Sequence, residues 1–185
     1  MPALINVITA HDHALVLYGI KNYLEKDSRI KVVGEANNGL TLLNLISTFK
    51  PLPHLVIIGS KMPVLSGEET VVRILKLYPN IKILILSTDA DIPTIAKLFS
   101  IGIHGYITKD DPPEKLVQSV FDIIDTGMCK NAYFDLQFEA DNGFSSTKNI
   151  KSTLSYNELE FIRLCSQGLS YSSIASHLYK SIKTV

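Results

Sequence analysis

Residues 53–67 read PHLVIIGSKMPVLSG, and this stretch decides how the rest of the chain is interpreted. Its first half is a continuous apolar run, which is typical of a strand buried on both faces of a parallel sheet. Its second half, after Gly59, is a loop that contains Met-Pro and closes on Gly67. In doubly wound α/β proteins the site lies at the carboxyl ends of the strands, so residue 59 is placed where function is expected.

Four further apolar runs occur between residues 5 and 108, namely INVITA, IKVVGEA, IKILILS and HGYIT. A segment with helical periodicity follows each of the five runs. Pro113 suits the first turn of the last helix, and Gly102 and Gly127 suit helix C-termini. Five βα units in succession predict a doubly wound, flavodoxin-like α/β domain over residues 1–128. The helices are predicted at residues 14–27, 39–49, 68–78, 91–102 and 113–127.

The remainder of the chain has a different character. Residues 129–152 are predicted to extend the last helix and then form a linker, because EADNGFSSTKNIKS is polar and has no apolar period. In residues 153–185, Ser155 and Glu158 form a capping box, and Gly168 separates two short apolar helices. Two helices joined at a glycine turn predict a partial, all-α helix-turn-helix segment.

The composition limits the function classes. Of the 185 residues, 46% are hydrophobic and 19% are charged, which supplies a core and argues against global disorder. The formal net charge is zero, so binding to nucleic acid would come from a local patch. No apolar stretch is long enough to span a bilayer, and no membrane partner is expected. Cys129 and Cys165 lie too far apart for a metal or redox motif, which predicts a cytoplasmic protein with buried thiols.

Several motifs, taken in order, resemble response regulators of the NarL/FixJ (LuxR-type) class, which belong to two-component signalling. VITAHDHALVLYGI, VVGEANNG, KMPVLSG, ILILST, GIHGYITKD and PPEKLVQSV resemble the receiver domain. LSYNELEFIRLCSQGLSYSSIASHL and KSIKTV resemble the helix-turn-helix tail. The resemblance covers nearly the whole chain and implies a (βα)5 receiver joined to a DNA-binding domain.

The resemblance also implies a phosphorylation site, from which this chain departs twice. The phosphoacceptor Asp maps to Gly59, which has no side chain to attack phosphorus, and the acidic pair maps to His11 and Asp12. We therefore expect no phosphotransfer, and weak or absent Mg²⁺ binding, because one carboxylate remains. An engineered Gly59 is an alternative, but the second departure at His11 favours a naturally degenerate receiver. The hydroxyl, aromatic switch and lysine positions map to Ser87, Tyr106 and Lys109.

Some roles around this pocket stay open from sequence. Lys109 is expected to pair with Asp12 and close the pocket. His11 and His13 form an H-x-H pair beside Asp12, which raises the hypotheses of a Zn²⁺ site and a pH sensor; an ordinary role without a metal is favoured. Ser87 and Tyr106 are expected either to form a fixed active-like or inactive-like arrangement or to be ordinary residues of strand ends.

The leading interpretation is an atypical transcription regulator whose pseudo-receiver works through homodimerisation or a partner. The resemblance places Lys183, Thr184 and Val185 at the start of the DNA recognition helix. Because the sequence stops there, it is expected to be a fragment of a longer regulator or a truncated one, and DNA binding is expected of the intact parent. Asp110 and Asp111 are predicted to cap the last domain helix. The candidate dimer interface comprises Ile92, Leu98, Phe99, Val117 and Val120, and the alternative for these residues is packing in the core of the domain.

Two other function classes compete with this interpretation. One is a protein-interaction module that titrates a histidine kinase or another regulator without DNA. The other is a flavodoxin-like cofactor enzyme, which is disfavoured because the first loop, TAHDHAL, lacks a phosphate cradle. The chain is therefore predicted to be neither an enzyme nor a cofactor protein.

Overall fold

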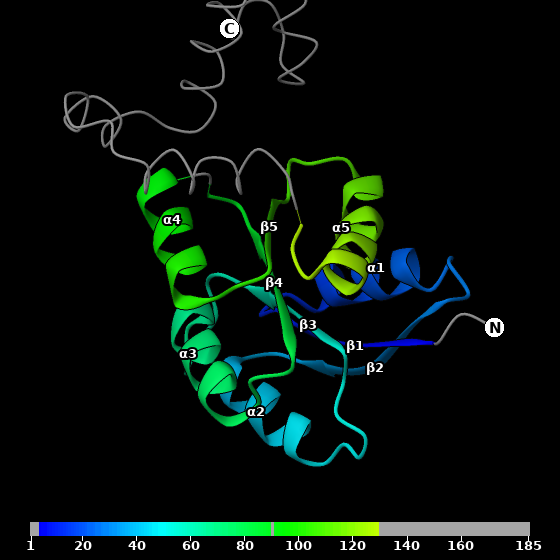
Figure 1. Cartoon of the computed structure of the whole chain (residues 1–185), viewed down its shortest axis with the longest axis horizontal. Coiled ribbons are helices and arrows are strands. Elements are labelled where there is room, and N and C mark those ends of the chain that lie inside the picture. The colour runs from blue at the N-terminus through cyan, green and yellow to red at the C-terminus, as the bar shows by residue number, and fades with distance from the viewer. Residues whose placement is uncertain (1–3, 90, 130–185) are drawn as a thin grey trace, which may run out of the picture.

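Five parallel strands form one sheet in the order β2-β1-β3-β4-β5 in this computed structural model, which describes residues 4–89 and 91–129. The chain runs from β1 outward to β2 and then crosses back to β3 (Figure 1). This reversal creates a topological switch point between β1 and β3, and sites lie at the carboxyl ends of the strands there. The strands are β1 (Ile5–Ala10), β2 (Ile30–Ala36), β3 (Leu55–Gly59), β4 (Lys82–Ser87) and β5 (Gly105–Thr108).

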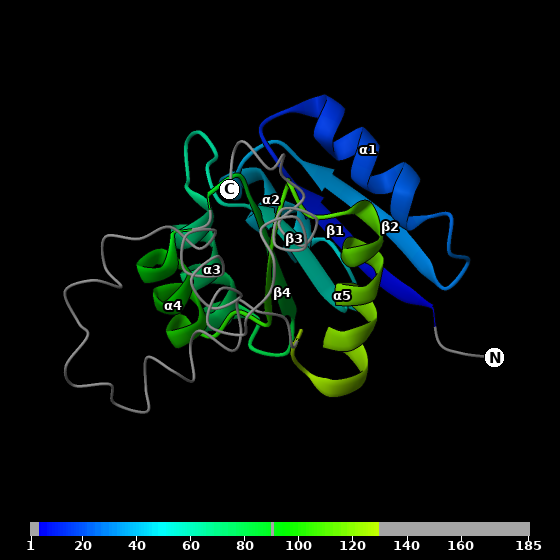
Figure 2. The same cartoon turned by 90° about the horizontal axis from the view of Figure 1, so that it is seen from above.

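Five helices cover the two faces of the sheet, so the predicted doubly wound α/β fold is confirmed. Helices α1 and α5 pack on one face, and α2, α3 and α4 pack on the other (Figure 2). Each predicted helix is present, with ends that differ by at most three residues. The helices are α1 (Ala14–Leu24), α2 (Gly39–Ser47), α3 (Gly67–Leu77), α4 (Ile92–Ile101) and α5 (Pro113–Thr126).

Strand β3 divides the core into two layers. Val56 and Ile58 pack in the cluster that includes α2, α3 and α4, whereas Leu55 and Ile57 pack in the cluster that includes α1 and α5. Successive side chains of a strand point to opposite faces, so a continuous apolar run fills both layers. All five residues of β3 are buried, and this places Gly59 at the buried end of the central strand.

Local signals fix most helix ends. Gly102 and Gly127 both have a positive φ, at 117° and 86°, and end α4 and α5 as predicted. A capping box between Ser66 and Glu69 starts α3. The prediction that Asp110 and Asp111 cap α5 is wrong, because the N-cap is Pro112 and makes no side-chain bond.

Asp111 instead turns back toward β5. Its Oδ2 accepts hydrogen bonds from the Thr108 backbone N at 2.9 Å and from Thr108 Oγ1 at 3.1 Å, and its Oδ1 pairs with Lys115 Nζ at 2.8 Å. The Asp111 carboxylate thus binds three donors where it lies, whereas an N-cap position would offer it only backbone N–H groups of the first turn of α5.

The predicted dimer interface is largely core. Leu98, Phe99 and Val120 are 3%, 4% and 0% exposed, so for these three residues the alternative, packing in the core of the domain, is the one observed. Helices pack their apolar stripe against the sheet, and these residues form that stripe in α4 and α5. Ile92 and Val117 are partly exposed and remain candidates.

The predicted linker and helix-turn-helix, with Lys183, Thr184 and Val185, lie outside the described residues, and their boundaries stay predictions. Cys129 is a buried free thiol, as predicted. Among the described helices, none has the length and apolar character that a membrane crossing requires.

Candidate functional site

The fold gathers the predicted pocket residues at one edge of the sheet. His11 and Asp12 follow β1, Gly59 ends β3, Ser87 ends β4 and Lys109 follows β5. All of these strands are parallel, so their carboxyl ends meet at that edge. The positions singled out from sequence therefore face one region of the molecule.

The ring of His11 fills the space above Gly59. His11 is 3% exposed. A Cβ built on Gly59 would lie 3.0 Å from His11 Cδ2, and 3.5 Å from both His11 Cγ and the Ala10 carbonyl oxygen. Carbon atoms attract best at about 3.5–4.0 Å, so the shortest contact is already repulsive. The two departures from the receiver pattern are thus sterically linked: with the imidazole in this position, the glycine is the residue that fits.

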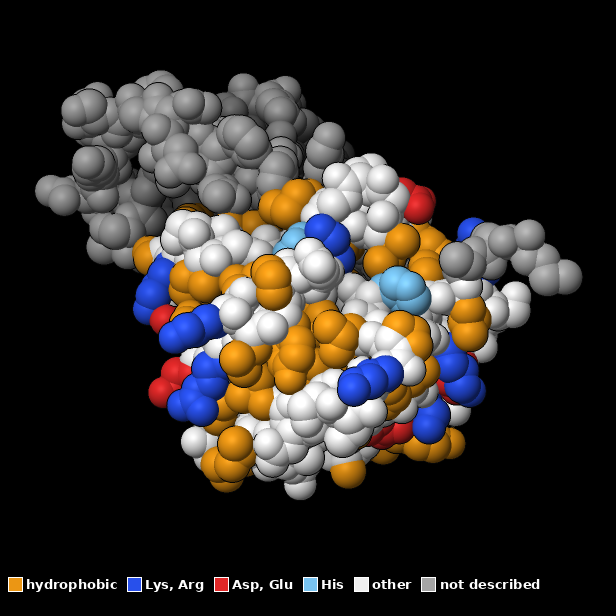
Figure 3. All heavy atoms as spheres, turned by 60° about the horizontal axis from the view of Figure 1, so that its bottom comes forward, with side chains coloured by type: hydrophobic (Ala, Val, Ile, Leu, Met, Phe, Trp, Pro, Cys, Tyr) orange, Lys and Arg blue, Asp and Glu red, His pale blue; other side chains and the backbone are white. Residues whose placement is uncertain are grey.

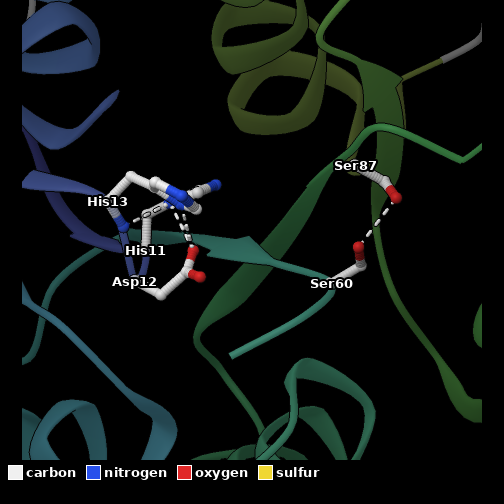
Figure 4. A network of polar contacts seen from close by, with 5 residues as sticks. All are labelled: His11, Asp12, His13, Ser60 and Ser87. Carbon is white, nitrogen blue, oxygen red and sulfur yellow. Dashed lines mark hydrogen bonds and ion pairs between the residues drawn. The ribbon is translucent and has the colours of Figure 1, made fainter. Parts of the chain in front are cut away.

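His11, Asp12 and His13 form a polar cluster at the end of β1 (Figure 4). Asp12 Oδ1 lies 2.9 Å from His11 Nδ1 and 2.9 Å from His13 Nδ1. The backbone N–H of His13 donates to His11 Nδ1 at 3.0 Å. Since that nitrogen accepts a hydrogen bond, the ring carries its proton on Nε2 and is neutral.

Electrostatics agrees with a neutral His11 beside an ionised Asp12. Burial lowers the pKa of His11, and the nearby Lys109 charge lowers it further, against the opposing effect of Asp12. Burial raises the pKa of Asp12, but the hydrogen bond from His13 and the attraction of the two imidazoles outweigh it, so that pKa lies below its usual value. The short His11–Asp12 contact is therefore not an ion pair at neutral pH, although its distance alone would suggest one.

Contrary to the prediction, Lys109 does not close the pocket. It forms no ion pair with Asp12, whose short contacts are to the two histidines. The prediction of a Lys109–Asp12 pair is wrong, because His13 reaches Asp12 from the next residue and needs no long side chain to be ordered. Lys109 is exposed, and its backbone N–H donates to the Ser87 carbonyl at 2.7 Å.

A pair of hydroxyls lies on the other side of the pocket. Ser60 Oγ and Ser87 Oγ are 2.7 Å apart (Figure 4). Ser87 Oγ also accepts from the Asp89 backbone N at 3.1 Å. Ser60 was not among the residues predicted from sequence. The only signal for it was its place directly after Gly59, where the chain leaves β3.

Tyr106 points inward. It is 1% exposed, and its hydroxyl donates to the Asp89 carbonyl at 2.7 Å. Burial raises the pKa of Tyr106, and a hydrogen bond with Ser87 opposes that shift. Lys61 Nζ holds the same loop through Asp89 Oδ2 at 2.8 Å. Ser87 and Tyr106 are therefore both hydrogen-bonded to Asp89 in the loop after β4.

The fold and this edge define a receiver, and the chain belongs to the response regulator receiver domain family, whose model matches residues 7–121. It is similar to the response regulator UvrY of Escherichia coli strain K12, with 28% identity over 188 residues that cover 98% of this chain and 83% of that protein. It is also similar to the response regulator protein VraR of Staphylococcus aureus strain NCTC 8325, with 29% identity, 98% and 85% coverage.

Solved structures agree with this assignment. RcsB of Salmonella typhimurium matches with a TM-score of 0.68 and 26% identity over 100% of this chain and 87% of that one. An RcsB–DNA complex matches with a TM-score of 0.67 and 26% identity, over 98% and 86%. The predicted resemblance to response regulators is confirmed.

The pocket does not fit the Mg²⁺ that the resemblance implies. Mg²⁺ takes oxygen ligands in near-octahedral geometry at about 2.0–2.1 Å. Asp12 supplies one carboxylate, while the two other close ligand atoms are imidazole nitrogens. Gly59 contributes no side chain, and the Ser60 and Ser87 hydroxyls bond to each other. We derive no reaction step through Mg²⁺.

Proposed function

We propose that this chain is part of an atypical response regulator whose receiver acts without aspartyl phosphorylation. One observation carries the proposal: Gly59 stands at the phosphoacceptor position, and the His11 ring packs against it. The pocket thus has no carboxylate nucleophile at residue 59, and a neighbour fills the room that such a side chain would need.

The polar contacts of the pocket support the same proposal. In a receiver that cycles, a phosphoryl group would supply the negative charge that organises the loop after β4. Here Lys61, Ser87 and Tyr106 all contact Asp89 without such a group. These contacts order the loop by internal bonds, so we infer that the domain holds one arrangement and serves as a docking and dimerisation unit.

The output is proposed to be transcription regulation. The solved relatives are described as an RcsB–DNA complex and as RcsB dimers bound to DNA. By analogy, the intact parent is proposed to bind DNA as a dimer, with Lys183, Thr184 and Val185 at the start of its recognition helix. A cytoplasmic setting remains part of this proposal.

Apolar side chains on the surface support control by a partner. Leu15 and Tyr18 of α1 are 81% and 65% exposed, and they lie one helical turn apart on the same side. Val72 and Leu77 of α3 are 47% and 60% exposed. Figure 3 shows a face on which apolar side chains gather among lysines and arginines. Exposed apolar groups of this size favour protein contacts.

The experiment that tests the proposal is incubation of the chain with Mg²⁺ and radiolabelled acetyl phosphate, a small phosphoryl donor. We expect no covalent label on the folded protein. A hydroxylamine-sensitive label, which marks an acyl phosphate, would contradict the proposal, and mapping it would show which carboxylate had replaced residue 59.

A second function, an interaction module that titrates a kinase or regulator without DNA, is favoured by the exposed Leu15 and Tyr18. DNA footprinting with the full-length parent separates the two functions. Protection of a discrete site supports the transcription regulator, whereas no protection together with capture of a kinase supports the interaction module.

A further inference from the structure

Three ligand atoms of different residues converge where β1 ends. The side chains of His11, Asp12 and His13 each offer one atom, and these atoms all lie within 4.8 Å of one another. Residue 13 is in an extended conformation, with φ −98° and ψ 115°, which lets residues 11 and 13 project to the same side of the backbone. Figure 4 shows both rings turned toward the Asp12 carboxylate.

Two of these atoms are electron-rich and face each other. His11 Nδ1 accepts the His13 N–H, so it carries no proton, yet it lies 2.9 Å from Asp12 Oδ1. Two acceptors at that distance repel unless a positive charge lies near both. The His13 ring supplies a partial answer, since its Nδ1 can donate to the same oxygen at 2.9 Å. A cation bound between the three groups would remove the repulsion between His11 Nδ1 and Asp12 Oδ1 more completely.

The distances suit a transition metal ion. Imidazole nitrogen and carboxylate oxygen bind Zn²⁺ at about 2.0–2.2 Å, which places neighbouring ligand atoms of a tetrahedral site about 3.3–3.6 Å apart. Both contacts of Asp12 Oδ1 are at 2.9 Å, so a small outward shift of each ring would open them to that spacing. Two imidazoles and a carboxylate select ions late in the first transition row over Mg²⁺. Binding would require the His11 ring to rotate away from the His13 N–H, the His13 ring to carry its proton on Nε2, and the three ligand atoms, which lie within 4.8 Å of one another, to reach a common spacing.

We propose that His11, Asp12 and His13 bind a late first-row divalent cation, of which Zn²⁺ is the representative probe, with solvent completing the coordination. This metal site rests on the proposed function in one respect. A pocket without aspartyl phosphate chemistry is free to take a different ligand. The cation would tie the loop before α1 to the ring that covers Gly59, so its binding would stiffen the same edge of the sheet.

The test is calorimetric titration of the whole chain with Zn²⁺ alone, together with amide NMR to locate the site. We expect one ion per chain with a dissociation constant below about 10 μM, and shifts at residues 11–13 and 59. Asp12→Asn and His13→Ala should each weaken binding at least about tenfold, since loss even of a residue that only supports a metal ligand typically costs that much. His13 is 69% exposed, so its replacement should leave the fold intact.

His54→Ala is the matched control, because His54 precedes β3 at the opposite edge of the sheet and should not affect the affinity. No Zn²⁺ uptake, or uptake that His13→Ala leaves unchanged, would overturn the proposal. Mg²⁺ that competes at equal concentration would overturn the choice of cation. Failure here and failure of the proposed function are distinguishable, since a chain that binds no Zn²⁺ can still prove inert to acetyl phosphate.

Discussion

Substituting Gly59 by alanine tests the steric link between His11 and the phosphoacceptor position. The added methyl would lie 3.0 Å from His11 Cδ2. Gly→Ala at an unstrained position stabilises a protein by about 0.4–1 kcal/mol through the unfolded state, whereas overpacking a dense core costs about 1–3 kcal/mol. We therefore expect Gly59→Ala to lower the free energy of unfolding by about 1 kcal/mol, because the buried ring has little room to move.

A double-mutant cycle isolates the contact. In a His11→Ala background the ring is absent, so Gly59→Ala should be neutral or stabilising, and the coupling between the two sites should be about 1–2 kcal/mol. Urea denaturation followed by circular dichroism measures each free energy. Gly19→Ala in α1 is the control, because a Cβ there would meet nothing within 4 Å and should stabilise the helix by up to about 1 kcal/mol.

An equal loss of stability from Gly59→Ala with and without His11 would contradict the steric link. Equal costs would mean that the Ala10 carbonyl, not the ring, restricts residue 59. The same steric link predicts which substitutions could restore phosphorylation at residue 59. Gly59→Asp alone should not restore phosphorylation, whereas Gly59→Asp with His11→Asp would remove the ring and return a second carboxylate to the pocket.

Two further predictions concern strain and pH. Val64 has a φ of 67° and is 78% exposed, so Val64→Gly should raise the free energy of unfolding by about 1 kcal/mol in urea melts, whereas Val72→Gly within α3 should lower it. Burial lowers the pKa of His104 to about 4, and the Lys82 charge adds to the shift. As the pH falls, the unfolded state therefore binds the proton before the folded state does. The free energy of unfolding should then decrease between about pH 6.5 and pH 4, by at most about 3 kcal/mol. His104→Asn should flatten that profile between these pH values in parallel melts; an unchanged slope would assign the loss to other groups.

The fold was accessible from sequence because its signals are local. The run from Leu55 to Ile58 is apolar without alternation, and only burial on both faces explains such a strand. Glycines at helix ends, as at Gly102, mark positions where the backbone enters the left-handed region. The site positions followed because parallel strands bring their carboxyl ends together.

Contacts that depend on distant parts of the chain were not accessible. The packing of His11 on Gly59 joins β1 to β3, and nothing in either local sequence encodes that distance. Ser60 was missed because its partner, Ser87, is 27 residues away. The sequence left interface and core open for Leu98 and Val120, because a single apolar stripe serves equally for the core and for an interface.

We propose that the receiver pocket takes no phosphoryl group. Titration of the chain with Mg²⁺ and beryllium fluoride, a phosphoryl mimic, followed by amide NMR, tests it most directly. We expect no saturable shifts at Asp12, Gly59, Ser87 or Lys109. Saturable shifts at these residues would show that the pocket still recognises the phosphoryl mimic, and would contradict the assignment of a phosphorylation-independent receiver.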